Sequence, residues 1–168
     1  MKKLNFIGLC LCILLGSVSA VSAQMAAAKR VPPAVEKKVV LNAPAEKVWE
    51  YVSEPANYKK ISGVKEFTCE EKALNAKIEL TTKSGKSRSQ YISVIDYDNY
   101  RICYFVTRSD YDGDNQWVYS FDIKPKGDKK CEFIVAIFHG FEPLPAEFDK
   151  EIIQEFNDII TGISKKFK

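Results

Sequence analysis

The sequence predicts one α+β domain, in which a curved antiparallel sheet of seven strands wraps around a long C-terminal helix. The helix is predicted from large apolar residues that share one helical stripe between Pro145 and Phe167. The sheet is predicted from one early strand and from six segments of alternating residues between Val64 and Gly140. The stripe of the helix consists of Phe148, Ile152, Phe156, Ile159, Ile163 and Phe167.

Residues 1–23 have the pattern of a secretory signal peptide. Two lysines precede an apolar run from Leu4 to Leu15, and the small residues Val21-Ser22-Ala23 follow it. The run is shorter than the roughly 20 residues that a membrane-spanning helix needs. We therefore expect cleavage after Ala23 and a periplasmic or secreted protein without a stable membrane anchor. Residues 24–34 are expected to form a flexible leader, and residues 35–168 a single folded domain.

The charges and cysteines exclude several classes of partner and cofactor. The chain has 25 basic and 22 acidic residues, and two of the lysines leave with the signal peptide. This near-balance gives no reason to expect nucleic acid as a partner. Cys103 and Cys131 fall on strands separated by a third strand, about 9–10 Å apart and beyond the roughly 7 Å limit for a disulfide. We expect these residues and Cys69 to be thiols, and no zinc site, because the chain has one histidine.

The first elements of the domain are a short strand and two short helices. Val39 to Leu41 are predicted as the strand. Pro44 suits the first turn of a helix, and Val48 and Trp49 give that helix a buried edge. Pro55 ends the helix and begins a second helical turn.

Five short turns divide the six following segments into an antiparallel meander. The turns are Leu74-Asn75, Ser84-Gly85, Asp98-Asn99, Asp112-Gly113 and Gly127-Asp128. If each loop has two or four residues, counting outward from the turns assigns every residue to a face of the sheet. The face toward the helix is then predicted to hold Phe67, Cys69, Ile78, Leu80, Tyr91, Ser93, Ile95, Ile102, Tyr104, Val106, Trp117, Tyr119, Phe121, Ile123, Ile134, Ala136 and Phe138.

The same counting predicts an apolar patch on the convex face, formed by Phe105, Val135 and Ile137. We expect this patch to be covered by the leader or by a second copy of the chain in a homodimer.

The segment from Val40 to Trp49, VLNAPAEKVW, and the segment from Glu54 to Tyr58, EPANY, resemble the opening of the START-like superfamily, also called SRPBCC. The resemblance is to its polyketide-cyclase and lipid-transport branches. It covers the whole domain in the order of elements, but only the first 25 or so residues in motif. It implies the helix-grip fold, with a cavity for an apolar or aromatic small molecule. It does not imply a reaction, because the fold is shared by carriers, cyclases and receptors.

The remaining polar residues do not form a catalytic or metal-binding pattern. His139 is the only histidine, and the counting places it on the convex face, which favours a structural role over a general base. Asp112-Gly113-Asp114 lacks the spacing of a calcium loop and is typical of a turn. No phosphate-binding loop or dinucleotide fingerprint is present in the sequence. We therefore expect no metal and no cofactor.

Aromatic residues with polar tips on the concave face predict a pocket for an amphipathic ligand. The favoured function is the non-enzymatic binding of a hydrophobic or aromatic small molecule or lipid. The alternatives are a cyclase- or dehydratase-type enzyme in the same cavity, an interaction module that uses the convex face, and a packed core without a cavity. The ligand-binding residues are predicted to be Tyr91, Ser93, Tyr104, Val106, Trp117, Tyr119, Phe121, Phe138, Phe148, Ile152, Phe156 and Ile159.

Overall fold

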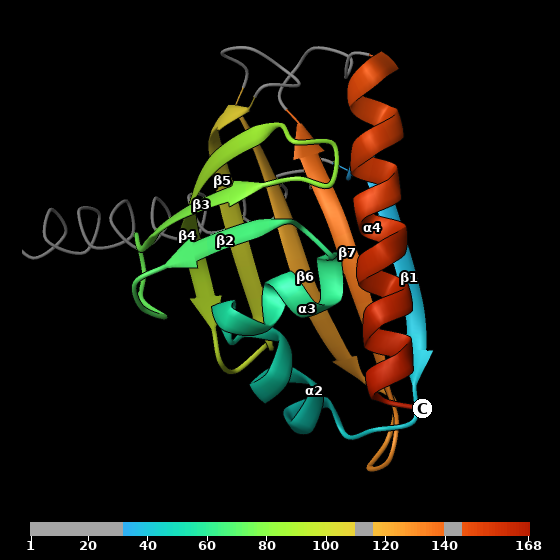
Figure 1. The fold of residues 1–168 in the computed structure, drawn as a ribbon. Coiled ribbons are helices and arrows are strands. Elements are labelled where there is room, and N and C mark those ends of the chain that lie inside the picture. The colour runs from blue at the N-terminus through green and yellow to red at the C-terminus, as the bar shows by residue number, and fades with distance from the viewer. Residues whose placement is uncertain (1–31, 110–115, 140–145) are drawn as a thin grey trace, which may run out of the picture. The chain divides into compact units, whose positions relative to one another are not determined.

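Seven strands of the described residues form one antiparallel sheet, in the order β1-β7-β6-β5-β4-β3-β2 (Figure 1). The computed structural model describes residues 32–109, 116–139 and 146–168. The strands are β1 (Val35–Leu41), β2 (Glu66–Cys69), β3 (Lys77–Thr81), β4 (Ser87–Asp96), β5 (Arg101–Ser109), β6 (Trp117–Pro125) and β7 (Cys131–His139). The helices are α2 (Ala45–Val52), the 3-10 helix η1 (Pro55–Asn57), α3 (Tyr58–Ser62) and α4 (Ala146–Lys166). This arrangement confirms the predicted fold class.

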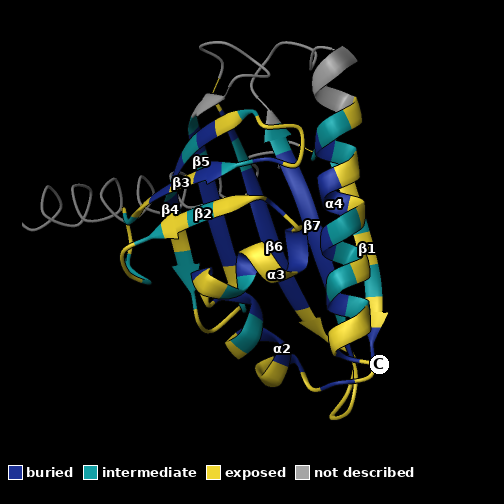
Figure 2. Ribbon diagram, in the orientation of Figure 1, coloured by how far each residue is buried: buried dark blue, intermediate teal, exposed yellow. Residues whose placement is uncertain are grey.

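The long helix α4 lies across the sheet and buries the predicted stripe against it (Figure 2). Ile152, Phe156, Ile159, Ile163 and Phe167 are all buried in one hydrophobic core with residues of the sheet. Burial of one such side chain contributes about 1.5–3 kcal/mol relative to its exposure, so the stripe holds the helix on the sheet. The side chain of Phe148 lies outside the described residues. None of the described helices has the length and apolar character that a membrane span requires.

The short helices follow β1 as predicted, with small differences at their ends. Pro44 is the residue before the first turn of α2, and Val48 and Trp49 are buried. Helix α3 ends at Gly63, whose φ of 69° is the left-handed conformation that favours glycine. Gly162 allows α3 to approach α4 closely, because a Cβ atom there would lie 2.7 Å from the carbonyl oxygen of Ile61.

The predicted register is correct in β5 and β6. Tyr104 pairs with Tyr119, and Val106 pairs with Trp117, so these residues share the concave face. The prediction is wrong in the first part of β4. Thr81 pairs with Ser87, which leaves five loop residues where an even number was expected, and this shifts the strand by one residue.

The concave face of β4 therefore carries Arg88, Gln90 and Ile92, which are all buried. Tyr91 instead pairs with Phe105 on the convex face. Ser93 is the extra residue of a bulge, since Ile92 and Val94 pair with two consecutive residues of β5. The bulge reverses the error, and Ile95 beyond it packs against the core as predicted.

The prediction for β7 is also wrong by one residue. Pro125 pairs with Cys131, so the loop between β6 and β7 again has five residues, and Gly127 in it has a φ of 90°. The concave residues of β7 are Phe133, Val135 and Ile137, in place of Ile134, Ala136 and Phe138. The counting had assigned His139 to the convex face. Its backbone instead pairs with that of Trp117, which is a residue of the concave face.

This correction removes two residues from the predicted convex patch. Val135 and Ile137 lie in the core, and Phe105 is half-buried. On the convex side of β4, Val94 is exposed, at 39%. Two of the three residues on which we based the expected cover by the leader or by a second copy thus face the core, and Ile134, Ala136 and Phe138 take the convex positions of β7.

Cys69, Cys103 and Cys131 are free thiols, which confirms the prediction. Strand β6 separates the strands of Cys103 and Cys131, as expected.

Candidate functional site

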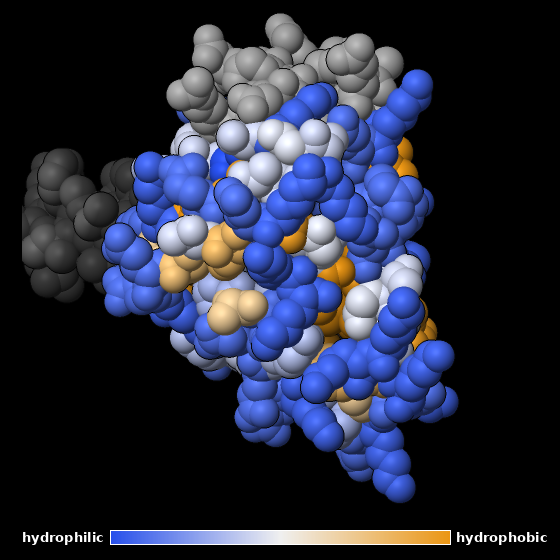
Figure 3. All heavy atoms as spheres, in the orientation of Figure 1, coloured by the Kyte–Doolittle hydropathy of each residue, from blue (hydrophilic) through white to orange (hydrophobic). Residues whose placement is uncertain are grey.

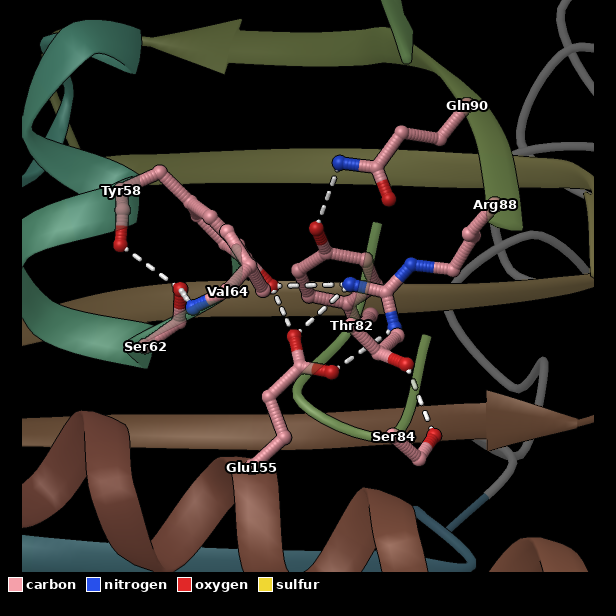
Figure 4. A network of polar contacts seen from close by, with 9 residues as sticks. Tyr58, Ser62, Val64, Thr82, Ser84, Arg88, Gln90 and Glu155 are labelled. Atoms are coloured by element: carbon pink, nitrogen blue, oxygen red, sulfur yellow. Dashed lines mark hydrogen bonds and ion pairs between the residues drawn. The ribbon is translucent and has the colours of Figure 1, made fainter. Parts of the chain in front are cut away.

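A cluster of polar side chains is buried between α4 and the sheet (Figure 4). Arg88 of β4 donates hydrogen bonds to both carboxylate oxygens of Glu155 of α4, at 3.0 and 2.7 Å. The hydroxyl of Tyr58, from α3, donates to the same carboxylate and accepts a hydrogen bond of 3.0 Å from Arg88. Three elements that are far apart in the sequence are thus joined by charge-assisted hydrogen bonds.

A second set of contacts continues the cluster across the sheet. The amide nitrogen of Gln90 donates to the hydroxyl of Tyr119 at 2.7 Å, and the ring of Tyr104 stacks on that of Tyr119 with centroids 4.8 Å apart. The guanidinium carbon of Arg88 lies 5.4 Å from the ring centroid of Trp117 and 5.6 Å from that of Tyr119. The positive charge is therefore enclosed by a carboxylate on one side and by aromatic rings on another.

The cluster keeps its charges balanced. Burial raises the pKa of Tyr58 well above its usual value, and the Glu155 carboxylate adds to the rise. Burial alone would lower the pKa of Arg88, but its attraction to Glu155 holds that pKa well above the usual value. Burial also raises the pKa of Tyr104. The tyrosines stay neutral, and the charge of Arg88 is compensated by Glu155.

Three polar atoms of the cluster have no hydrogen-bond partner among the described residues. They are Nε of Arg88, the side-chain oxygen of Gln90 and the hydroxyl of Tyr104. Each of these side chains is at most 1% exposed. Leaving a buried polar atom unpaired costs about 1–3 kcal/mol, so natural proteins rarely do so without a functional reason or an ordered water.

A pocket of about 260 Å³ opens next to this cluster, between α4, the link from α3 to β2 and the hairpin that joins β3 and β4. Glu155 is buried in the wall of this pocket. Figure 3 shows apolar atoms in the seam between α3 and α4, on a face that is otherwise mostly hydrophilic. The lining residues are Ser62, Val64, Thr82, Lys83, Ser84, Glu151, Gln154, Glu155 and Asp158.

The hairpin is held to α4 by contacts at the rim of this pocket. Lys83 contacts Asp158 at 2.6 Å, and Lys86 contacts Glu151 at 3.4 Å. The hydroxyl of Ser84 donates to Glu151 at 2.5 Å. Ion pairs exposed to solvent contribute at most about 1 kcal/mol each, so the hairpin is held more weakly than the core.

A second pocket of about 260 Å³ lies beside η1 and β2 and includes Cys69. The thiol of Cys69 donates to the carbonyl oxygen of Glu71 at 3.1 Å, and burial raises its pKa. A protonated thiol is a poor nucleophile, so this pocket offers little chemistry. Among the described residues, no three histidine, cysteine or acidic side chains are grouped so that they could hold a metal ion.

Eight of the twelve predicted site residues come together in the core. They are Tyr104, Val106, Trp117, Tyr119, Phe121, Ile152, Phe156 and Ile159. Their own side chains occupy the space where the cavity was expected: the Tyr119 ring lies 5.7 Å from Phe121 and 6.3 Å from Phe156, between centroids. The pocket lies beside this group and not within it.

The other four predicted residues are not placed in this group. Tyr91 and Phe138 lie on the convex side of the register, and Ser93 is the bulge residue. The side chain of Phe148 falls outside the part of the chain that the structure describes.

The predicted site also omitted Tyr58, Arg88, Gln90 and Glu155. Glu155 had a signal in the sequence, because it follows Ile152 by three residues on the apolar stripe of α4. Arg88, Gln90 and Ile92 are spaced two residues apart, so they lie on one face of the strand. Once the register of β4 was known, this spacing would have placed Arg88 and Gln90 beside the core.

No protein-family model and no curated protein matches this chain. Solved structures do. A structural-genomics protein from Nitrosospira multiformis is 15% identical, with a TM-score of 0.66, over 80% of this chain and 95% of its own. Norcoclaurine synthase from Thalictrum flavum, solved with a transition-state analogue, is 13% identical, with a TM-score of 0.61, over 82% and 97% of the two chains.

The Zhui aromatase/cyclase from Streptomyces is 11% identical, with a TM-score of 0.64, over 79% of this chain and 91% of its own. At these identities the likeness is one of fold. The chain has a helix-grip fold, as the resemblance of its opening segment implied.

Proposed function

We propose that the protein binds a small, largely apolar molecule in the pocket between α4 and the hairpin of β3 and β4. The observation that carries this proposal is the position of Glu155, which is in the wall of the pocket and is also part of the buried polar cluster. The pocket volume of about 260 Å³ is close to the lower end of the range for ligand sites, roughly 300–1,000 Å³. It suits a molecule with one or two rings.

Several polar groups in the pocket wall already form hydrogen bonds within the protein. The hydroxyl of Ser62 donates to the carbonyl oxygen of Tyr58, and that of Thr82 interacts with Ser84. The amide of Gln154 donates to Asp158. Because these groups already have partners, the body of the ligand needs to offer little more than apolar surface. The neighbours with the same fold include enzymes named for norcoclaurine synthesis and aromatisation, which supports a small-molecule role.

Isothermal titration calorimetry with toluene tests this proposal. We expect saturable binding to the parent protein. Val64→Phe should fill the pocket and weaken binding at least tenfold, whereas Val94→Phe, at an exposed position away from the pocket, should not change it. If toluene gives no saturable heat, or if both variants bind as the parent does, the pocket is not a ligand site.

A second candidate is an enzyme in the same pocket. It is favoured by one observation: the wall of the pocket contains a carboxylate that accepts a hydrogen bond from Tyr58. Against it, Arg88 occupies both oxygens of this carboxylate. Extraction of the bound compound from protein purified from its own host separates the two functions. A compound that stays unchanged when returned to the protein supports binding, and one that is converted by the parent but not by Glu155→Gln supports catalysis.

We also propose that the protein is exported, since residues 1–23 have the charge, the apolar run and the small residues of a signal peptide. The intact mass of the processed protein should correspond to a chain that begins at Gln24. A longer chain would contradict this.

A further inference from the structure

Seven exposed lysines gather in two segments, the hairpin that joins β6 and β7 and the end of α4. Across residues 124–132 and 159–168, the acidic residues are Asp128 and Glu132, so positive charges exceed negative ones by five. The near-balance of charge over the whole chain does not show this local excess. The seven residues, which we call the lysine surface, are Lys124, Lys126, Lys129, Lys130, Lys165, Lys166 and Lys168.

The two segments lie at the same end of the domain. Leu41, the last residue of β1, pairs with Cys131, which directly follows the β6–β7 hairpin. Helix α2 begins four residues after Leu41, and the ring of Tyr51 in α2 lies 5.6 Å from that of Phe167 at the end of α4. Figure 1 shows the C-terminal end of α4 and the β6–β7 hairpin at one end of the molecule, and Figure 3 shows that this end is hydrophilic.

Most of these lysines have no acidic partner in the part of the chain that the structure describes. Lys126 lies 3.8 Å from Glu132, and the ammonium of Lys166 lies 5.1 Å from the ring centroid of Tyr51. The other five form no ion pair with a described residue. Lys165 and Lys166 also complement the negative end of α4, but the hairpin lysines have no such role. Lysines gathered in one place repel one another, and an anionic partner removes this repulsion.

We propose that the lysine surface binds the anionic phospholipid headgroups of a membrane. Each lysine close to an anionic membrane strengthens binding about fivefold, so several lysines together hold a protein reversibly at the surface. The protein then lies on the membrane and does not cross it. This inference is independent of the proposed ligand site, because none of the seven lysines lines that pocket.

The types of residue favour a membrane over a nucleic acid. Proteins that bind nucleic acids commonly use arginine for phosphates and base edges, and aromatic rings that stack on bases. All seven cations of this surface are lysines, and Phe167, the aromatic residue of the two segments, is buried. A lysine is a mobile point charge, which suits a layer of headgroups without fixed positions.

Co-sedimentation with lipid vesicles tests the inference. The protein is purified from its own host, so that any processing has taken place. At about 0.1 M salt it should bind vesicles of phosphatidylcholine mixed with phosphatidylglycerol about tenfold or more tightly than vesicles of phosphatidylcholine alone. At about 1 M salt this difference should disappear, because the Debye length falls from about 10 Å to about 3 Å.

Two variants test the two segments separately. The hairpin variant combines Lys124→Gln, Lys129→Gln and Lys130→Gln, and the helix variant combines Lys165→Gln and Lys168→Gln. Each should bind the mixed vesicles about tenfold or more weakly than the parent. All five side chains are exposed, so the thermal midpoints should change little, which shows that the variants are folded.

The control variant removes three exposed lysines elsewhere on the surface and has the same net charge as the hairpin variant. It combines Lys59→Gln, Lys60→Gln and Lys77→Gln and should bind the mixed vesicles as the parent does. If the control and hairpin variants are weakened equally, binding depends on net charge and the inference is wrong.

Three further outcomes would overturn the inference. The parent may not distinguish the mixed vesicles from phosphatidylcholine alone. The helix variant could bind as the parent does, in which case the two segments do not act as one surface. Tighter binding of double-stranded DNA than of the mixed vesicles, at the same salt, would identify a nucleic acid as the partner. None of these results bears on the binding of toluene in the pocket, so the proposed function is tested separately.

Discussion

Glu155 on α4 and Arg88 on β4 form a buried ion pair with two hydrogen bonds, of 3.0 and 2.7 Å, across 67 residues of sequence. Their side chains are 8% and 1% exposed, respectively. The pair links the helix to the sheet at the point where the proposed pocket meets the core.

The first prediction concerns the stability of this pair. Arg88→Met leaves Glu155 buried without a counterion and should lower the free energy of unfolding by about 3–5 kcal/mol. The double variant Arg88→Met with Glu155→Leu should recover most of this loss, because two apolar side chains need no compensation. Urea unfolding of the parent, both single variants and the double variant measures the coupling.

Lys83→Met is the control, since the Lys83–Asp158 pair is exposed and should contribute less than about 1 kcal/mol. If the double variant is as unstable as Arg88→Met, the instability of Arg88→Met does not come from the uncompensated charge of Glu155.

The second prediction distinguishes a packed core from the cavity that the sequence suggested. Phe156 is 1% exposed and lies among aromatic rings of the sheet. Phe156→Ala should therefore lower the free energy of unfolding by about 3–5 kcal/mol, through lost burial and a new void. Asn157→Ala, at the next and exposed position, should have little effect. A loss below about 2 kcal/mol for Phe156→Ala would indicate that a cavity already exists at this position.

The third prediction is a loss of stability at alkaline pH. Burial raises the pKa of Cys103 from 9.0 to about 11. Above pH 9 the unfolded chain releases this proton while the folded protein retains it, so stability decreases as the pH rises from 9 to 11. The raised pKa values of Tyr58 and Tyr104 act in the same direction at higher pH.

Urea midpoints at several pH values from 8 to 11 measure this decrease. Cys103→Ala should make the decrease shallower. The same slope in the parent and in this variant would show that Cys103 is not responsible.

The fourth prediction concerns the contact between α3 and α4. In Gly162→Ala the new Cβ would lie 2.7 Å from the carbonyl oxygen of Ile61. The overlap should cost about 1–3 kcal/mol, against up to about 1 kcal/mol gained from the better helix propensity of alanine. Thermal unfolding should show a lower midpoint, whereas Thr161→Ala, at an exposed position of the same helix, should change it little. A higher midpoint for Gly162→Ala would mean that the two helices can separate without cost.

The sequence alone determined the elements whose signals are local. The spacing of Ile152, Phe156 and Ile159 predicts α4 because a helix brings residues three and four apart onto one side. The faces of β5 and β6 were predicted correctly, since counting outward from the short turns placed Tyr104 and Tyr119 on the same side of the sheet. The three thiols also followed from the order of the strands.

Only the tertiary structure decided the faces of β4 and β7. Every residue from Phe133 to Phe138 is apolar, so alternation cannot show which of them face inward, and the register depends on one residue of loop length. In β4 a five-residue loop shifts the register by one residue and a bulge then shifts it back. The prediction missed both, and so it assigned Tyr91 to the concave face, which Gln90 and Ile92 occupy.

The polar cluster could likewise be found only in the folded protein. In the sequence, Arg88 and Glu155 look like the charged residues that cover most protein surfaces. Neither is stable in a core alone, because burial of one charge is costly unless an opposite charge bonds to it. The chain brings the two together over 67 residues, and their mutual compensation is a property of the fold rather than of either local segment.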